Sequence, residues 1–195
     1  MGKTKSEGRT HGRTYTAFID IRKAYPTAYR PAMLTKLKRA GVTGHLFRAV
    51  EATYHNVQGS IQVGQDTSTP YNIEQGVREG SALSPVLYSI FINDLLEEIQ
   101  NTGEGVAIAE DPTCRVAILG YADDIVLVSR TADGLQNMLD VVARHAAKNF
   151  YQISQSKSKV VVFGDESECT NNESTMWEVH GMYNDDKNGI PDHIE

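Results

Sequence analysis

Several features are scarce in this sequence, and each scarcity excludes a class of protein. Cysteine occurs only twice, at Cys114 and Cys169, which predicts neither a disulfide framework nor a cysteine metal site. The longest apolar run, near residues 86–92, is too short to cross a bilayer. Residues 1–7 lack the apolar segment of a signal peptide. We therefore expect an intracellular protein, nuclear or cytoplasmic, with no membrane partner.

Basic residues are scarce toward the C-terminus, and acidic residues are scarce toward the N-terminus. Residues 1–40 carry ten Lys or Arg against two Asp or Glu, whereas residues 165–195 carry one against nine. The net charge of −6 therefore does not exclude a nucleic-acid partner, because the basic part could contact phosphates. A solvated basic leader is an equally good interpretation of the charge alone.

The hydrophobic pattern predicts one α+β domain over residues 14–164, with helices packed on one face of an antiparallel sheet. Residues 1–13 indicate a basic linker or a cut end, and residues 165–195 an acidic, disordered tail. We expect strands over 14–21, 60–63, 70–73 and 159–163, with 70–73 pairing with 60–63. Further strands are expected within 105–119, interrupted at residues 110–112, and helices are expected to start at Pro31, Thr43, Ser84 and Thr131. In the third helix, which runs to Gln100, Ser84 is the predicted N-cap and Pro85 the first helical residue.

Two adjacent carboxylates stand between two short apolar runs. Residues 116–119 and 125–128 each predict a buried strand, and Tyr121-Ala122-Asp123-Asp124 predicts the hairpin tip between them. Asn-Gly or Asp-Gly would be the favoured turn, so turn geometry alone does not explain this tip. Two unit charges about 4 Å apart repel by roughly 4 kcal/mol at an effective dielectric constant near 20, and a bound divalent cation removes that repulsion. The tip is therefore either a cation site or a surface turn with two solvated carboxylates.

Three further segments carry polar residues at the ends of apolar ones. Asp20 ends the strand that contains Phe18 and Ile19, a glycine loop covers residues 76–85, and Lys157 precedes the last strand. In order and spacing, these segments and the hairpin resemble motifs A, B, C and D of a reverse transcriptase palm, specifically of the non-LTR (LINE-type) retrotransposon kind. The resemblance covers about residues 15–164 and implies the right-hand polymerase palm fold.

The resemblance implies an RNA-directed DNA polymerase that adds a dNTP to the 3′-hydroxyl of a DNA primer on an RNA template. By the same resemblance, Asp20, Asp123 and Asp124 are the catalytic residues and hold two Mg²⁺ ions, for which Mn²⁺ can substitute. Two metal ions in such a site stabilise the attacking and leaving oxygens of an in-line displacement. A strand-end carboxylate in water is the alternative interpretation of Asp20.

Other residues match family positions that contact the nucleotide. Tyr25 falls where an aromatic ring excludes a 2′-hydroxyl, although a half-buried core aromatic would look the same. The loop Arg78-Glu79-Gly80 is expected under the templating base pair, where glycine permits close approach; a tight turn explains its glycines equally well. Lys157 matches a lysine that neutralises or protonates pyrophosphate, or it is an exposed lysine before a strand. The resemblance also implies template-primer contacts for Tyr121, Ser84 and Pro85.

Three positions depart from the family pattern. The family usually has Gln at the position of Glu79, Asp at that of Pro26, and Asn-Pro at residues 154–155, which are Ser-Gln here. None of these departures touches the three aspartates. They lower the expected efficiency of the enzyme, not the expectation of its ancestry.

Several alternatives remain open from the sequence. The chain has no room for the fingers and thumb of a working enzyme, so we expect a truncated palm from a longer parent polyprotein. A catalytically inactive palm remnant, a nucleic-acid-binding module and a group II intron-type reverse transcriptase are the alternatives. In residues 184–195 the spacing of oxygen ligands resembles an EF-hand Ca²⁺ loop except for Asn184 in first place, but a polar tail is the favoured interpretation.

Overall fold

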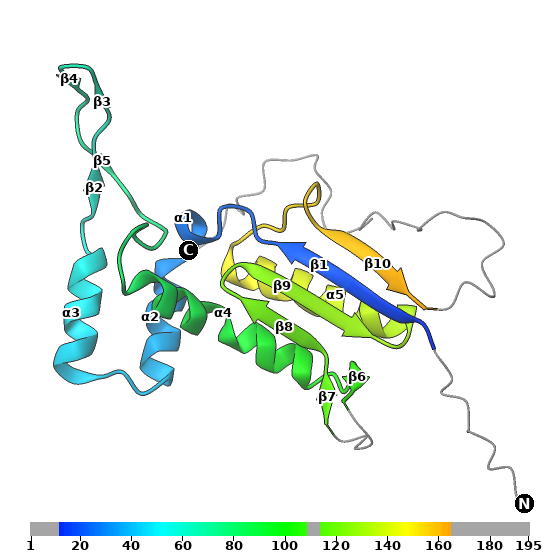
Figure 1. The fold of residues 1–195 in the computed structure, drawn as a ribbon. Helices are drawn as coiled ribbons and strands as arrows, with labels where there is room; N and C mark the ends of the chain where they lie inside the picture. The colour runs from blue at the N-terminus through cyan, green and yellow to red at the C-terminus, as the bar shows by residue number, and fades with distance from the viewer. Residues whose placement is uncertain (1–11, 109–113, 165–195) are drawn as a thin grey trace, which may run out of the picture.

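A four-stranded antiparallel sheet forms the centre of the computed structural model, which describes residues 12–108 and 114–164. The strand order is β10-β1-β9-β8, with β1 at Thr14–Asp20, β8 at Ile118–Tyr121, β9 at Asp124–Ser129 and β10 at Lys159–Phe163. Figure 1 shows β1 between β9 and β10, two strands that are far from it in the sequence. The predicted α+β class, with an antiparallel sheet, is confirmed.

Two long helices cover one face of this sheet (Figure 1). They are α4 (Ser84–Gln100) and α5 (Ala132–Asn149). Because side chains alternate along a strand, Ala17, Ile19 and Leu127 face the helices and are at most 4 % exposed. Their neighbours Phe18 and Leu119 point to the other face and are 43 % and 56 % exposed. The core therefore lies on the helix side, and some large hydrophobic side chains on the opposite face of the sheet are exposed.

The remaining helices lie to one side of the sheet. Helix α1 (Ala24–Thr27) follows β1, and α2 (Arg30–Arg39) and α3 (Gly44–Tyr54) follow in turn. Helix α2 packs on both α3 and α4. Each of the predicted helices is present, and none of the helices in the described ranges is both long and apolar enough to span a bilayer.

The predicted helix caps have different outcomes. Thr131 caps α5 as predicted, because its hydroxyl oxygen accepts a hydrogen bond from the Gly134 N–H at 3.0 Å. Thr43 stands at the N-cap of α3 but makes no capping hydrogen bond with its side chain. The prediction for Ser84 is wrong, since Ser84 is the first helical residue and its hydroxyl donates to the carbonyl oxygen of Arg78 at 2.6 Å. That bond ties the preceding loop to the helix instead of capping it.

The pairing predicted for residues 60–63 with 70–73 is also wrong. These residues form two small ribbons, in which β2 (Gln58–Gly59) pairs with β5 (Tyr71–Asn72) and β3 (Gln62–Val63) pairs with β4 (Asp66–Thr67). Val63 pairs with Asp66 across a two-residue turn, and Gly64 has a φ of +62°. A glycine with positive φ suits a tight hairpin, so this segment folds back on itself first.

Short strands β6 (Val106–Ala107) and β7 (Arg115–Val116) form the last ribbon. They confirm strands within residues 105–119, while the expected interruption at residues 110–112 lies outside the described residues. The acidic tail over 165–195, its EF-hand-like spacing and most of the basic segment 1–13 also lie outside them.

Candidate active site

Three aspartates come together at one end of the sheet. Asp20 is the last residue of β1 and Asp124 the first of β9, and the two are directly opposed in the antiparallel register. Asp123 lies in the two-residue turn between β8 and β9. The apolar runs that form β1 and β9 pair with each other at the centre of the sheet and leave the carboxylates at its rim. Asp20 is half-buried, with its side chain 26 % exposed, and Asp124 is exposed.

The turn of this hairpin carries backbone strain. Tyr121 pairs with Asp124, so Ala122 and Asp123 form the turn, and Ala122 has a φ of +55°. Two-residue hairpin turns favour positive φ, but a residue with a Cβ adopts it at a cost of order 1–3 kcal/mol. The turn thus keeps a tight geometry without the glycine that would relieve it, and Asp123 follows the strained position directly.

The segment before β10 is fastened to Asp20. The Asp20 N–H donates to the Ser158 hydroxyl oxygen at 3.2 Å, and the Asp20 carbonyl oxygen accepts from the Ser154 N–H at 2.9 Å. The Arg22 N–H donates to the Gln152 carbonyl oxygen at 2.8 Å. These bonds bring the Lys157 Nζ to 3.7 Å from an Asp20 carboxylate oxygen. Sequence reasoning missed Ser158, because a serine before a strand carries no signal of a partner 138 residues away.

The oxygen donors of the three aspartates suit a hard divalent cation. Among the described residues, however, the group whose ligand atoms all lie within 4.8 Å of one another is a different one, discussed below. The Asp20, Asp123 and Asp124 carboxylates are therefore not yet converged on one point, while their backbones are adjacent and their side chains reach solvent. The chemistry of the donor set fits a metal site.

Tyr25 lies on α1, a few positions after Asp20 in the sequence, and is half-buried. Its ring stacks on that of Tyr88 of α4, with centroids 5.0 Å apart and an interplanar angle of 17°. Its carbonyl oxygen accepts a hydrogen bond from the Val77 N–H at 2.8 Å. The predicted glycine loop is thus attached to the segment that carries Tyr25. Sequence reasoning missed Tyr88, because the apolar pattern of α4 indicates that its residues are buried but does not indicate a particular contact.

A buried arginine anchors the same loop from the other side. Arg30 is 7 % exposed, its Nε donates to the Gly76 carbonyl oxygen at 2.8 Å, and a second guanidinium nitrogen donates to the Ile73 carbonyl oxygen. Burial lowers the pKa of Arg30, and nearby Arg78 lowers it further, against an opposing effect of Tyr54. Arg30 also lies over the Tyr54 ring, 5.3 Å from its centroid. The guanidinium therefore fixes the start of the loop.

The remaining predicted residues occupy different environments. Arg78, Glu79 and Gly80 are exposed at the loop tip, and Gly80 has a φ of +78°. Tyr121 is 85 % exposed beside the aspartates, and Pro85 is exposed. Ser84 is 1 % exposed, and its hydroxyl donates to the carbonyl oxygen of Arg78. Their predicted roles stay predictions.

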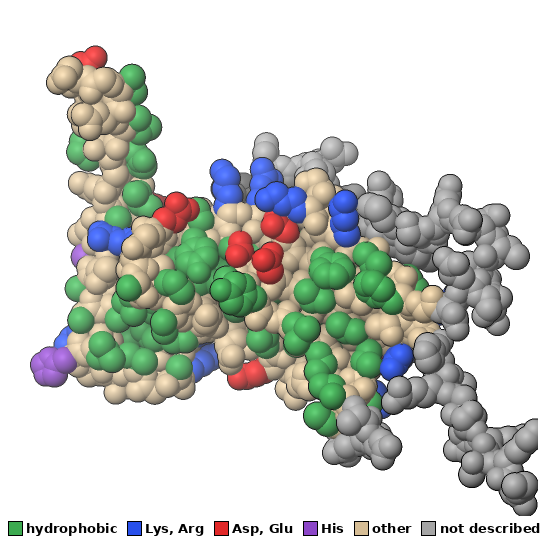
Figure 2. Space-filling model, in the orientation of Figure 1, with side chains coloured by type: hydrophobic (Ala, Val, Ile, Leu, Met, Phe, Trp, Pro, Cys, Tyr) green, Lys and Arg blue, Asp and Glu red, His purple; other side chains and the backbone are tan. Residues whose placement is uncertain are grey.

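The surface around the aspartates has mixed charge. Figure 2 shows acidic side chains gathered near the middle of one face, next to a group of Lys and Arg side chains. Arg22, Lys23 and Lys157 are exposed on the segments beside Asp20. Such a combination of carboxylates and cations can hold a metal-bound polyphosphate.

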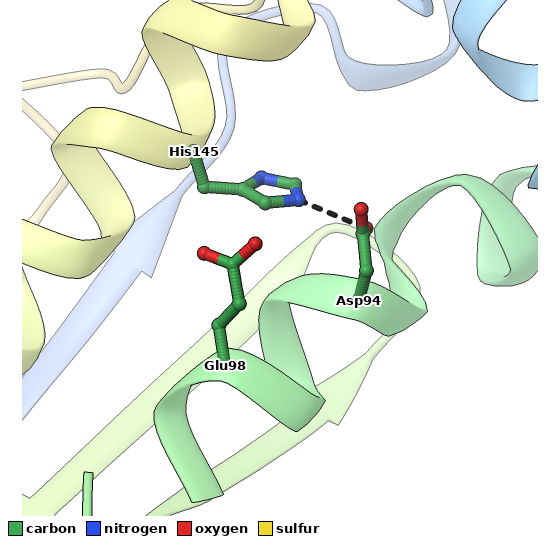
Figure 3. Close-up of side chains that lie close together, drawn as sticks. All are labelled: Asp94, Glu98 and His145. Carbon is green, nitrogen blue, oxygen red and sulfur yellow. Dashed lines mark hydrogen bonds and ion pairs between the residues drawn. The ribbon is translucent and has the colours of Figure 1, made fainter. Parts of the chain in front are cut away.

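A second group of polar side chains lies behind the sheet, between α4 and α5 (Figure 3). Asp94, Glu98 and His145 offer ligand atoms within 4.8 Å of one another. The Lys36 ammonium, however, already lies 2.7 Å from the same Asp94 oxygen that His145 Nε2 approaches to 2.9 Å. Burial raises the pKa of Asp94, but hydrogen bonds from His145 and Lys36 outweigh it and hold the pKa at about 2. Lys36, Asp94 and His145 therefore form an ion-pair network that joins α2, α4 and α5.

Comparisons with known proteins agree with the fold. A family model described as "Reverse transcriptase (RNA-dependent DNA polymerase)" matches residues 3–183. The Pol polyprotein of a type-1 R2 retrotransposable element from Popillia japonica is 32% identical over 121 residues, which cover 62% of this chain and 20% of that protein. The RNA-directed DNA polymerase of the mobile element jockey from Drosophila funebris is 32% identical over 154 residues, which cover 76% of this chain and 16% of that protein. The chain therefore spans about a fifth or less of the length of these relatives.

Solved structures with the same fold come from telomerases. Apo telomerase from Candida tropicalis, truncated from its C-terminal domain, superposes with a TM-score of 0.59 at 15% identity over 86% of this chain and 33% of that one. Telomerase from Candida albicans, solved with a TWJ fragment of telomeric RNA, superposes with a TM-score of 0.60 at 12% identity over 78% of this chain and 28% of that one. At such identities the likeness shows the fold alone.

Proposed function

This chain belongs to the reverse transcriptase (RNA-dependent DNA polymerase) family, and we propose that it is the palm of an RNA-directed DNA polymerase from a non-LTR retrotransposon. The observation that carries the proposal is the direct opposition of Asp20 and Asp124, with Asp123 in the adjoining turn. Two relatives at 32% identity belong to an R2 element and to the mobile element jockey, which favours the non-LTR kind over the group II intron kind.

The reaction that fits the site is transfer of a nucleotidyl group. The primer 3′-hydroxyl loses its proton to water, and its oxygen forms a bond to the α-phosphorus of a dNTP. The bond from that phosphorus to the α–β bridging oxygen breaks, and pyrophosphate leaves. Reverse transcriptases in general use divalent metal ions. We propose Mg²⁺, with Mn²⁺ as a substitute, held as two ions by Asp20, Asp123 and Asp124. When bound, these ions would stabilise the attacking and leaving oxygens.

The protein residues around the aspartates have complementary roles in this proposal. Lys157, whose Nζ lies 3.7 Å from Asp20, neutralises or protonates the leaving pyrophosphate. Tyr25 excludes a 2′-hydroxyl by bulk and so selects dNTP over rNTP. The exposed loop Arg78-Glu79-Gly80 supports the nucleotide and its templating base, where glycine permits close approach of the backbone.

The partners of the chain are part of the proposal. We infer an RNA template, a DNA primer and dNTP as substrates, and a longer polyprotein as the parent, because the chain spans 20% and 16% of two relatives. Tyr121, exposed beside the aspartates, would contact the template-primer. The nuclear or cytoplasmic location stays a prediction from the sequence.

Primer extension on an RNA template tests the proposal. The unaltered chain and Asp123→Asn are compared with dNTPs in Mg²⁺ or Mn²⁺, and we expect extension only from the unaltered chain. In parallel, Mn²⁺ binding is measured by electron paramagnetic resonance, and we expect it to weaken in Asp123→Asn. Extension that persists in Asp123→Asn would overturn the assignment of the site. An absence of extension with Mn²⁺ binding intact would favour an inactive palm.

A further inference from the structure

Tyr88 is a buried tyrosine with an unusual environment. It lies on α4, is 1 % exposed, and its hydroxyl makes no hydrogen bond to any of the described residues. A buried hydroxyl without a partner costs free energy, whereas phenylalanine would fill nearly the same space without that cost. Burial raises the pKa of the phenol, and nearby Asp123 and Tyr25 raise it further. Tyr88 is therefore a core residue that also contacts the site residue Tyr25, through their rings.

Two backbone hydrogen bonds attach the segment that carries Tyr25 to the glycine loop over residues 76–85. The Tyr25 carbonyl oxygen accepts from the Val77 N–H, and the Ala28 carbonyl oxygen accepts from the Gly76 N–H, each at 2.8 Å. These bonds fix where the main chain runs. They leave the orientation of the Tyr25 ring to its packing.

Tyr88 supplies that packing through a ring contact. The two rings are nearly parallel, at 17°, with centroids 5.0 Å apart, which is the offset-stacked arrangement that aromatic pairs prefer. Tyr88 is itself held in the core, where its ring lies 5.9 Å from that of Phe91. A ring that excludes a 2′-hydroxyl must not rotate away when a ribonucleotide approaches. The stack on a fully buried partner provides that resistance.

We propose that Tyr88 is a positioning residue that sets sugar selectivity by holding the Tyr25 ring against rotation. The inference rests on the proposed function, since selectivity has meaning only for a polymerase. It adds a determinant that lies 63 positions away from Tyr25 in the sequence and has almost no exposed surface of its own. The ring of Tyr88 carries this role and its hydroxyl does not.

The test compares two substitutions at one position. In primer extension, kcat and KM are measured separately for a dNTP and for the matching rNTP. We expect Tyr88→Leu to lower discrimination against the rNTP by roughly three- to tenfold, the range that corresponds to losing an aromatic stack. Most of the change should be a higher kcat/KM for the rNTP. Tyr88→Phe keeps the ring, and we expect its discrimination to match that of the unaltered protein.

A control separates the stack from general damage to the core. Leu95 lies on the same helix, seven positions after Tyr88, and is 0 % exposed. Leu95→Ala therefore opens a cavity in the core beside α4. We expect it to lower stability and to leave discrimination unchanged. Unchanged discrimination in folded Tyr88→Leu, or an equal fall in Leu95→Ala, would overturn the inference.

A second readout needs no nucleotide. Urea unfolding of Tyr25→Leu, Tyr88→Leu and the double variant forms a double-mutant cycle. We expect the shifts in midpoint to be non-additive, because either single change already breaks the stack; additive shifts would overturn the inference. The proposed function fails in a different way, through a lack of Asp123-dependent extension by the unaltered protein, so the two failures are distinguishable.

Discussion

Asp20 and Asp124 face each other directly across the antiparallel pair of β1 and β9. Opposed side chains in such a pair have Cβ atoms about 4.5–5.5 Å apart, and like charges there destabilise the sheet. Asp123, which precedes Asp124 in the sequence, lies at the same rim of the sheet. The fold therefore carries a repulsion that it does not need for stability, and a bound cation is the simplest chemical reason to keep it.

Asp20→Asn should separate function from stability. We expect primer extension to fall by at least about 100-fold, because a charged ligand that acts on the reacting centre is lost. The free energy of unfolding should stay the same or rise by a few tenths of a kcal/mol, since a like-charge pair is removed. Extension assays and urea unfolding followed by circular dichroism measure the two quantities. Asp140→Asn, on the exposed side of α5, is the control, and equal losses in both variants would contradict the prediction.

Lys157→Ala should reduce extension without destabilising the protein. The Lys157 side chain is 71 % exposed, and an exposed ion pair contributes under about 1 kcal/mol, so unfolding should change little. We expect the rate of extension at saturating dNTP to fall by about 100-fold, the low end for loss of a general acid. Lys148→Ala, another exposed lysine, is the control. A rate equal to that of the unaltered protein would remove Lys157 from the proposed chemistry.

Local patterns in the sequence predicted much of the fold. The alternation before Asp20 and the apolar run from Ile125 indicated strands, and the structure has β1 and β9 there. Thr131 and the periodicity that follows it gave α5 and its cap. Each of these features depends on residues within a few positions of one another, which is the range over which propensity and periodicity carry information.

The contacts that complete the candidate site are not local. Ser158 meets Asp20 across 138 positions, and the Tyr88 ring meets the Tyr25 ring across the helices and ribbons that lie between α1 and α4 in the sequence. No periodicity marks such partners, because many serines and buried aromatics would look the same. The wrong pairing of 60–63 with 70–73 has a related cause, since the nearer turn at Gly64 competes with the longer connection. The positions of the three aspartates were indicated by motif spacing, whereas their support was not.

Asp94 should make stability depend on pH in the acid range. Hydrogen bonds from His145 and Lys36 outweigh burial and hold its pKa at about 2, below the ordinary 3.8. Its contribution is therefore complete above about pH 4 and is lost as the pH falls through about 2. We expect Asp94→Ala to lower the free energy of unfolding by about 1–3 kcal/mol at pH 7, because Lys36 and His145 lose their shared acceptor. Urea unfolding of the unaltered protein and of Asp94→Ala at a series of pH values measures this difference in the free energy of unfolding.

The difference between the unaltered protein and Asp94→Ala should narrow as the pH falls from about 4 toward 2. Asp140→Ala, which lacks the buried partners of Asp94, should show a small difference at every pH. A difference for Asp94→Ala that stays constant down to pH 2.5 would show that its carboxylate is not the acid-sensitive group. Such a result would also remove the ion-pair network as a link between the helices.

Gly76→Ala should destabilise the protein through a clash and not through backbone strain alone. Gly76 has a φ of +85°, and an added Cβ would lie 2.8 Å from the carbonyl carbon of Pro26. Gly41 has a φ of +90° with open space around it, so Gly41→Ala isolates the strain, about 1–2 kcal/mol. We expect Gly76→Ala to cost at least about 1 kcal/mol more, since rigid backbone atoms must move apart. Urea unfolding of the two variants gives the difference, and equal losses would mean that the loop and the Tyr25 segment are not packed as tightly as this structure has them.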